Sequence, residues 1–119
     1  MNDEFIKRFT EACMKLCREK EDYTKTNAIK HNIAMKKLAE IYNELSNDKN
    51  NAEVIYNELM SDDDKIIRMM AAFHSLSLNI NINKAEEVLR KIIENTDNPI
   101  EKFNAETILK NWKEGKLTM

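Results

Sequence analysis

The sequence predicts an all-α domain of about six helices, packed as three antiparallel pairs. One glycine and one proline in 119 residues leave few of the tight turns that an all-β fold needs. Apolar residues recur instead at spacings of three and four, the period of a helix that is buried on one side. The length and a hydrophobic content of 42% are typical of one globular domain, which we expect to span residues 1–119.

The first pair of helices is expected over residues 3–46. Apolar residues on one side predict a helix over residues 3–20, with Asp3 and Glu4 placed to complement its dipole. Residues 21–26 are polar and are expected to connect it to a second helix over residues 27–46. The two apolar stripes consist of Phe5, Ile6, Phe9, Cys13, Leu16 and Cys17 in the first helix and Ile33, Leu38, Ile41, Tyr42 and Leu45 in the second.

Three later helix starts share the pattern N-x-x-E. Asparagine accepts a hydrogen bond from an exposed backbone N–H, and a glutamate three residues later can return to the cap. The pattern begins at Asn50, Asn83 and Asn98, which predicts helices from about residues 51, 84 and 99. Pro99 suits a first helical position, and Gly115 suits the end of the last helix. The second and third pairs are therefore expected over residues 51–79 and 84–114.

Residues 66–78 form the most hydrophobic predicted helix. They read IIRMMAAFHSLSL, which leaves no broad polar face, so we expect the central helix of the domain there. Residues 76–83 alternate like a strand, but no second segment offers a partner for one. We interpret them as a helix end and a short link, with Ile80 and Ile82 turned inward.

An internal repeat supports this organisation. Shifted by 33 residues, the chain partly matches itself, and a period in this range is typical of helical solenoids. The first pair is then a divergent terminal repeat, as solenoids commonly have. The matched positions include Asn50 with Asn83, Ile55 with Val88, Asp64 with Asp97, Met70 with Phe103, Ala72 with Ala105 and Leu76 with Leu109.

The second helix of the middle pair resembles that of a short HEAT-like repeat. The residues that carry the resemblance are Asp62, Asp64, Ile67, Arg68, Ala71, Ala72 and Leu76. In HEAT-like repeats the aspartates cap the turn and the arginine spans neighbouring repeats, which the resemblance implies for Asp62, Asp64 and Arg68. The next unit departs from the pattern, because Glu101 occupies the place of Arg68.

Over essentially its full length the chain also resembles a small bacterial helical-repeat family of unknown function. The most specific part is the ending Leu109, Trp112 and Gly115 within AETILKNWKEG. Members of that family resemble immunity proteins of polymorphic-toxin and contact-dependent inhibition systems. The resemblance implies a non-catalytic protein that neutralises a cognate bacterial toxin by binding its toxin domain. The alternative is a generic HEAT-like adaptor or regulator with another protein partner.

No enzyme active site is expected from these residues. There is no Ser/His/Asp set, and a single glycine excludes a P-loop. His31, His74, Cys13 and Cys17 are the candidates for a metal site, but they fall on three predicted helices rather than in close-spaced pairs. We expect no metal and no cofactor, and we expect the cysteines to be reduced thiols.

Charge and hydropathy narrow the range of partners. The formal net charge is −2 and both halves are balanced, which disfavours a nucleic-acid binder. No continuous apolar run is long enough to span a bilayer, and the first residues do not read as a signal peptide. We therefore expect a cytoplasmic protein with a protein partner, and no membrane or direct nucleic-acid contact.

The expected contact surface is the side lined by the second helix of each pair. Acidic anchors there would suit a toxin such as a nuclease with a basic cleft. Arg68 and His74 are the polar groups through which residues 66–78 could reach a neighbouring helix or a partner. The candidate acidic anchors are Glu40, Glu44, Asp62, Asp63 and Glu106.

Several of these residues also have a purely structural interpretation. The run from Asp62 to Asp64 suits the start of a helix, where carboxylates cap free N–H groups. His74 is expected to be hydrogen-bonded at the edge of the core. The seven methionines either fill the core or form an adaptable binding groove.

Overall fold

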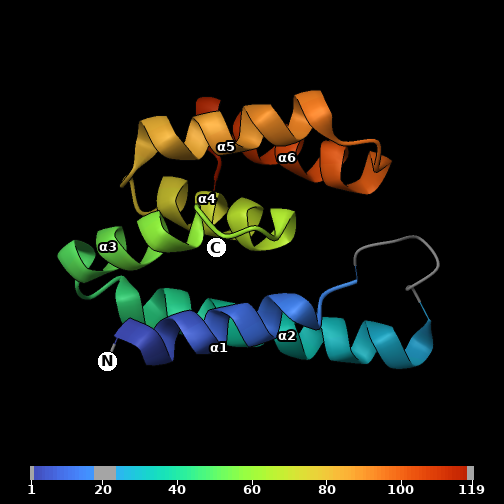
Figure 1. Ribbon diagram of the computed structural model, residues 1–119, viewed down its shortest axis with the longest axis horizontal. Helices are drawn as coiled ribbons and strands as arrows, with labels where there is room; N and C mark the ends of the chain where they lie inside the picture. The colour runs from blue at the N-terminus through green and yellow to red at the C-terminus, as the bar shows by residue number, and fades with distance from the viewer. Residues whose placement is uncertain (1, 18–23, 118–119) are drawn as a thin grey trace.

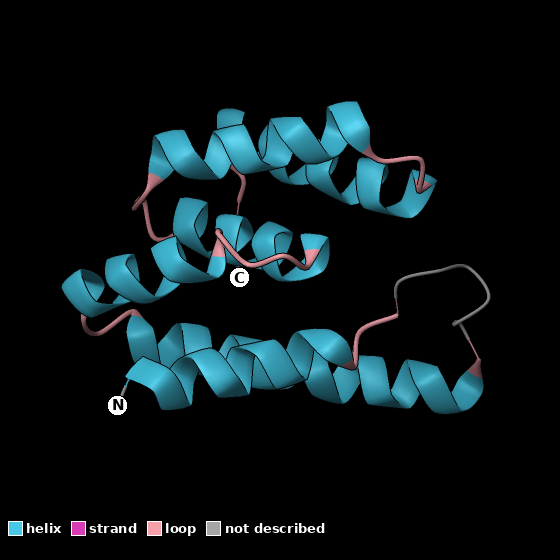
Figure 2. Cartoon of the chain, in the orientation of Figure 1, coloured by secondary structure: helices cyan, strands magenta, loops and turns pink. Residues whose placement is uncertain are grey.

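The computed structural model describes residues 2–17 and 24–117, and they form six α-helices and no strand (Figures 1 and 2). The all-α prediction is therefore confirmed. The helices are α1 (Asn2–Met14), α2 (Lys25–Leu45), α3 (Lys49–Leu59), α4 (Lys65–Ser77), α5 (Ile82–Asn95) and α6 (Pro99–Lys113). No helix in the described ranges is long and apolar enough to cross a membrane.

The helices form three antiparallel pairs that stack as layers (Figure 1). The pair α1 and α2 lies at one side, α3 and α4 lie in the middle, and α5 and α6 lie at the other side. Helix α4 contacts α1, α3, α5 and α6, so it is the central helix that the sequence predicts. Every residue from Met69 to Leu76 except Phe73 is buried, which explains the lack of a polar face.

The first pair differs from its prediction at the connection. Helix α1 ends at Met14 instead of continuing to residue 20, and the N–H groups of Lys15 and Leu16 close a turn onto the carbonyls three residues back. Helix α2 begins at Lys25, earlier than predicted, because Thr24 Oγ1 accepts from the N–H of Asn27 at 3.2 Å. The rest of the predicted connector, residues 18–23, lies outside the described residues.

In two of the three N-x-x-E segments the asparagine is not the helix cap, although each helix begins within about two residues of its predicted start. Asp48, not Asn50, caps α3, since its Oδ1 accepts from the N–H of Asn51 at 3.2 Å. Helix α5 begins at Ile82, one residue before Asn83, and Asn81 precedes it at φ 49° without a side-chain cap. The Asn81 amide donates instead to the carbonyl of Glu53 on α3, so it ties the middle pair to the last pair.

The third start is confirmed in its cap. Asn98 Oδ1 accepts from the N–H groups of Ile100 and Glu101 at 2.9 and 3.3 Å, and α6 begins at Pro99. The carboxylate of Glu101 accepts from Thr96 Oγ1, which itself accepts from the N–H of Asn98. The same carboxylate pairs with Lys65 of α4 at 3.0 Å and thereby links the second and third pairs.

The link between α4 and α5 has the predicted character. The helix ends at Ser77, and Asn79 and Asn81 adopt positive φ, which asparagine tolerates better than most residues. Ile80 between them is buried, so the alternating pattern of residues 76–83 reflects a tight link and not a strand.

The internal repeat is only partly preserved in the packing. Ala72 and its repeat equivalent Ala105 are both fully buried. Leu76 and its equivalent Leu109 are also buried, with exposed fractions of 1% and 7%. Phe103 is 65% exposed, although its repeat equivalent Met70 is only 6% exposed. No helix of the described residues covers Phe103, so the same helical position faces solvent in the layer of α5 and α6.

Candidate functional site

The predicted partner residues occupy separate places in the structure. Glu40 and Glu44 lie on α2, Asp62 and Asp63 lie in the turn before α4, and Glu106 lies on α6. The candidate acids thus come from three separate elements, and whether they share one contact surface stays a prediction.

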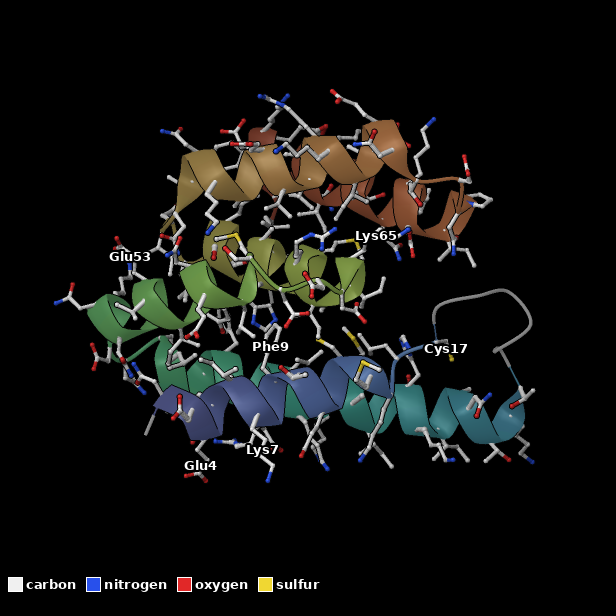
Figure 3. All side chains as sticks on the ribbon, in the orientation of Figure 1. Glu4, Lys7, Phe9, Cys17, Glu53 and Lys65 are labelled. Carbon is white, nitrogen blue, oxygen red and sulfur yellow. The ribbon has the colours of Figure 1, made fainter. Side chains whose placement is uncertain are left out.

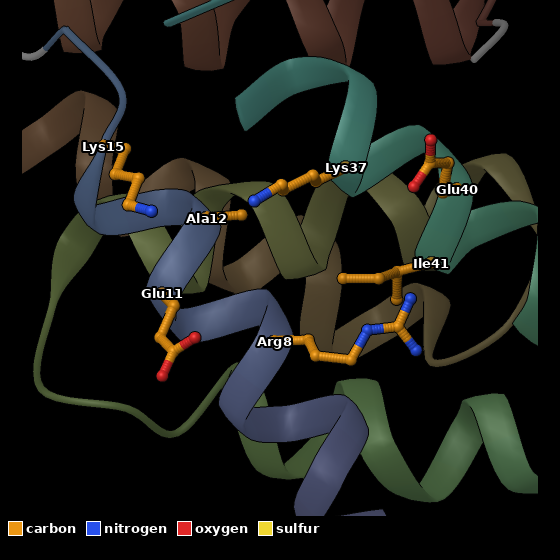
Figure 4. A pocket seen from close by; sticks show the side chains of 7 residues that line it. All are labelled: Arg8, Glu11, Ala12, Lys15, Lys37, Glu40 and Ile41. Atoms are coloured by element: carbon orange, nitrogen blue, oxygen red, sulfur yellow. The ribbon is translucent and has the colours of Figure 1, made fainter. Parts of the chain in front are cut away.

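Glu40 borders the crevice between α1 and α2 (Figure 4). The crevice has a volume of about 190 Å³ and carries both signs of charge, from Arg8, Lys15 and Lys37 against Glu11 and Glu40. Arg8 donates to Glu44 at 2.7 Å, and this hydrogen bond raises the pKa of the guanidinium above its ordinary value. Glu44 is thus already engaged within the first layer.

Arg68 stabilises its own turn. Its Nη1 donates to the carbonyls of Asp62 and Asp63 at 2.7 and 2.9 Å, so it does not make the bridge between repeats that the HEAT-like resemblance implies. Asp64 caps α4 through Oδ1, which accepts from Ile66 and Ile67, as the capping interpretation predicts. Asp62 Oδ1 accepts from the N–H of Asp64 at 2.9 Å and completes the same turn.

His74 lies at the centre of the core and not at its edge. Its side chain is completely buried, so it cannot touch a partner in this conformation, and our placement of it on a contact surface is wrong. The ring makes edge contacts at 5.3 to 5.7 Å between centroids, and Phe9 among its neighbours reaches it from the first layer (Figure 3). The four rings around it are Phe9, Tyr42, Tyr56 and Phe73.

The imidazole of His74 is neutral. Desolvation lowers its pKa to about 3, because a charged ring would have no water around it. Tyr56 Oη lies 2.9 Å from Nδ1, whereas Nε2 and the neighbouring Ser75 Oγ have no hydrogen-bond partner in the described part of the chain. Burial likewise raises the pKa of Tyr56. Burial therefore favours the neutral form of both side chains near neutral pH.

A groove opens where the second helices of all three pairs meet. It has a volume of about 350 Å³ and a mostly apolar lining. Cys17 borders it, and the N–H of Cys17 donates to Nδ1 of His31 at 3.0 Å. The lining residues are Leu16 and Cys17, then His31 and Met35 of α2, Ile66, Met69, Met70 and Phe73 of α4, and Asn104, Thr107 and Ile108 of α6.

The lining of this groove shows that some methionines belong to the core and others border a surface groove. Met69 and Met70 are almost fully buried, yet they line the groove wall, and Met35 is 36% exposed at its rim. Met60 is simply a core residue. The side formed by the second helices is therefore hollowed, apolar and rich in sulfur.

The N-terminal half of α2 is the least buried helical segment beside the groove. Residues 25–33 include no buried side chain, and Figure 1 shows this end of the helix reaching past the end of α1. Ile29 is 56% exposed and Ile33 is 51% exposed, so the prediction that Ile33 belongs to the buried stripe is wrong. Helix α1 has 13 residues against 21 in α2 and leaves this half uncovered.

Lysines without acidic residues among them occupy this part of α2. Residues 25–37 contain four lysines and no Asp or Glu, although the whole chain has a net charge of −2. In the described ranges these lysines form no ion pair. A count of charges in short windows of the sequence would have detected this basic segment. The charge balance of the two halves of the chain does not reveal it, because acidic residues elsewhere in the same half offset the lysines. The four are Lys25, Lys30, Lys36 and Lys37.

The cysteines and histidines do not form a metal site in the described residues. Cys13 is buried and Cys17 is partly buried, and no disulfide joins them. Within residues 2–17 and 24–117, no three His, Cys, Asp or Glu side chains gather as a metal ion would require. Comparison with protein-family models, curated proteins and solved structures gives no significant match to this chain.

Proposed function

We propose that this chain is a non-catalytic protein-binding module, and that the N-terminal half of α2 is its main contact element. One observation carries the proposal: nine successive helical residues, 25–33, contain no buried side chain. A helix in a folded protein gains most of its stability from packing, so an unpacked half-helix is expected to find its packing in a partner. Ile29 and Ile33 provide apolar contacts there, at about 1 kcal/mol for covering the exposed half of each side chain.

The groove on the opposite side of the same half-helix extends this contact element. Met35 and Ile33 are two residues apart, which places them on opposite sides of a helix of 3.6 residues per turn. A partner that covers the half-helix would therefore meet exposed isoleucines on one side and the apolar groove at Met35 on the other.

In its specific form the proposal is that of an immunity protein. The resemblance at Leu109, Trp112 and Gly115 supports a cytoplasmic protein that binds a cognate bacterial toxin domain and blocks its active site or its access to substrate. A tightly bound inhibitor can occlude an enzyme by shape alone, so it needs no catalytic residues of its own. The alternative remains a HEAT-like adaptor with another protein partner.

The immediate test is co-expression with the product of the adjacent gene, which the proposal expects to be a toxin. Protection of cell growth together with co-purification of the two proteins is the expected result for an immunity protein. Co-purification without protection would favour the adaptor. A result that shows no protection and no co-purification would contradict the immunity proposal.

The contact element is tested with Ile29→Ser and Ile33→Ser. Both side chains are more than half exposed, so each variant should keep native circular dichroism and lose about tenfold in affinity for the partner. Val54→Ser on α3 is the matched control, since Val54 is 58% exposed on a different helix. Equal affinity for all three variants would place the interface elsewhere.

A further inference from the structure

We propose that the solvent-facing side of the N-terminal half of α2 docks an acidic amphipathic helix of a partner protein. This inference rests on the proposed function, because it states the chemistry of the partner that the module binds. We call the surface the lysine–isoleucine face. It consists of Lys25, Ile29, Lys30, Ile33, Lys36 and Lys37.

The first argument is the local charge of this face. The four lysines form no ion pair with a described residue, and residues 25–37 contain no Asp or Glu, although Glu40 follows one turn later and borders the same crevice as Lys37. Four lysines within residues 25–37 create a local positive potential that attracts an acidic surface and repels a basic one. The expected partner surface is therefore acidic, the reverse of the basic cleft that the acidic anchor candidates suggest.

The second argument is the apolar ridge that two isoleucines form on this face. Ile29 and Ile33 are one turn apart, so their side chains form a short apolar ridge with lysines beside it. An apolar centre with a charged rim is the usual composition of a protein interface. A ridge of this spacing packs into the groove between side chains of a second helix.

The same composition argues against two other anionic partners. Single-stranded nucleic acid is commonly bound through aromatic stacking, and this face has no aromatic residue and no arginine. Two half-exposed isoleucines also provide little apolar area for insertion into a lipid surface. A protein helix uses both features of the face at once.

A designed peptide tests the inference directly. The probe is a fluorescent helical peptide in which leucine recurs every fourth residue with glutamate on either side. Its control carries lysine in place of each glutamate. We expect the full chain to bind the probe by fluorescence anisotropy, to ignore the control, and to bind at least tenfold more weakly when NaCl rises from about 0.05 M to about 0.5 M.

Charge reversal locates the binding. Lys30→Glu/Lys36→Glu should weaken probe binding by at least about tenfold, and both side chains are exposed, so the fold should persist by circular dichroism. Lys102→Glu/Lys110→Glu on α6 makes the same change of charge at exposed positions outside the face and should bind like the wild type.

Several results would overturn the inference. They are no binding of the acidic probe, equal binding of the lysine control peptide, equal loss in both double variants, or retention of a single-stranded oligonucleotide or phosphatidylglycerol vesicles in place of the peptide. A toxin domain that co-purifies equally with wild type and Lys30→Glu/Lys36→Glu would also overturn it, while leaving the proposed function intact.

Discussion

Helix α4 and the N-terminal half of α2 both carry large apolar residues at helical spacing, but those residues lie in opposite environments. In α4, Ile67, Ala72 and Leu76 are at most 2% exposed, because helices from all three layers contact it. In α2, Ile29 and Ile33 are more than half exposed, because the partner helix α1 ends too early to cover them. The difference shows that apolar residues at helical spacing mark a contact surface, and that neighbouring elements decide whether the contact is internal.

The largest expected effect comes from placing a carboxylate in each environment. Ala72→Asp puts an unpaired charge beside fully buried neighbours, and we expect a loss of at least about 3–5 kcal/mol, enough to unfold most small domains. Ile33→Asp exposes its charge to water and should change stability by about 0.5 kcal/mol or less. Urea unfolding followed by circular dichroism measures both.

A native denaturation midpoint in Ala72→Asp would show that α4 is not the centre of the core. Unfolding of Ile33→Asp would show that the N-terminal half of α2 is packed after all, and would remove the main support for a docking surface there.

Amide hydrogen exchange sharpens the same comparison without mutation. Amides of α4 should exchange only on global unfolding, whereas those of residues 29–33 should exchange at least about a hundredfold faster through local fraying. Addition of a bound partner should slow the exchange of residues 29–33 selectively. Equal protection of the two segments in the free protein would contradict the contrast drawn from burial.

The sequence predicted the middle of the molecule better than its ends. The burial of α4 could be predicted because residues 66–78 are apolar on every side, so any packed neighbour gives the same result. The cap at Asn98 was also predictable, because Pro99 fixes the first helical position. The start of α3 was not, since Asp48, Asn50 and Asn51 all lie in one run of capping residues.

The candidate site was less predictable for a physical reason. Ile33 and Phe103 have the same spacing as core residues, and their exposure depends on which helices lie beyond them. Likewise, His74 could be recognised as a helical residue but not as the centre of an aromatic cluster, because Phe9, Tyr42 and Tyr56 come from three other helices.

Mild acid should weaken the core through His74. Its pKa is about 3 in the folded protein and about 6.5 in the unfolded chain, so the unfolded state binds more protons below that higher value. The contribution of the neutral ring is fully present above about pH 6.5 and falls as pH drops toward 3, by about 2 kcal/mol between pH 7 and pH 5. Urea unfolding at the two pH values measures it.

His31 on the exposed half of α2 provides the control for this prediction. It lies beside the groove and is only partly buried, so His31→Gln should retain the loss of stability between pH 7 and pH 5. A wild-type stability that is flat over this range, or a loss that disappears in His31→Gln, would mean that His74 is not the group responsible.

The smallest expected effect on stability comes from replacing Lys84 or Lys30, one bonded to described residues of the chain and one not. Lys84 Nζ donates to Asn57 O, Asn57 Oδ1 and Ser61 Oγ at 2.8 to 3.0 Å, so it joins α5 to α3, whereas Lys30 bonds to no described residue. Lys84→Ala should lower stability by about 0.5–1 kcal/mol because surface hydrogen bonds exchange with water, and Lys30→Ala should leave it unchanged. Thermal unfolding of both variants decides the matter: a larger loss in Lys30→Ala would mean that this lysine has a partner within the chain and is not held for another protein.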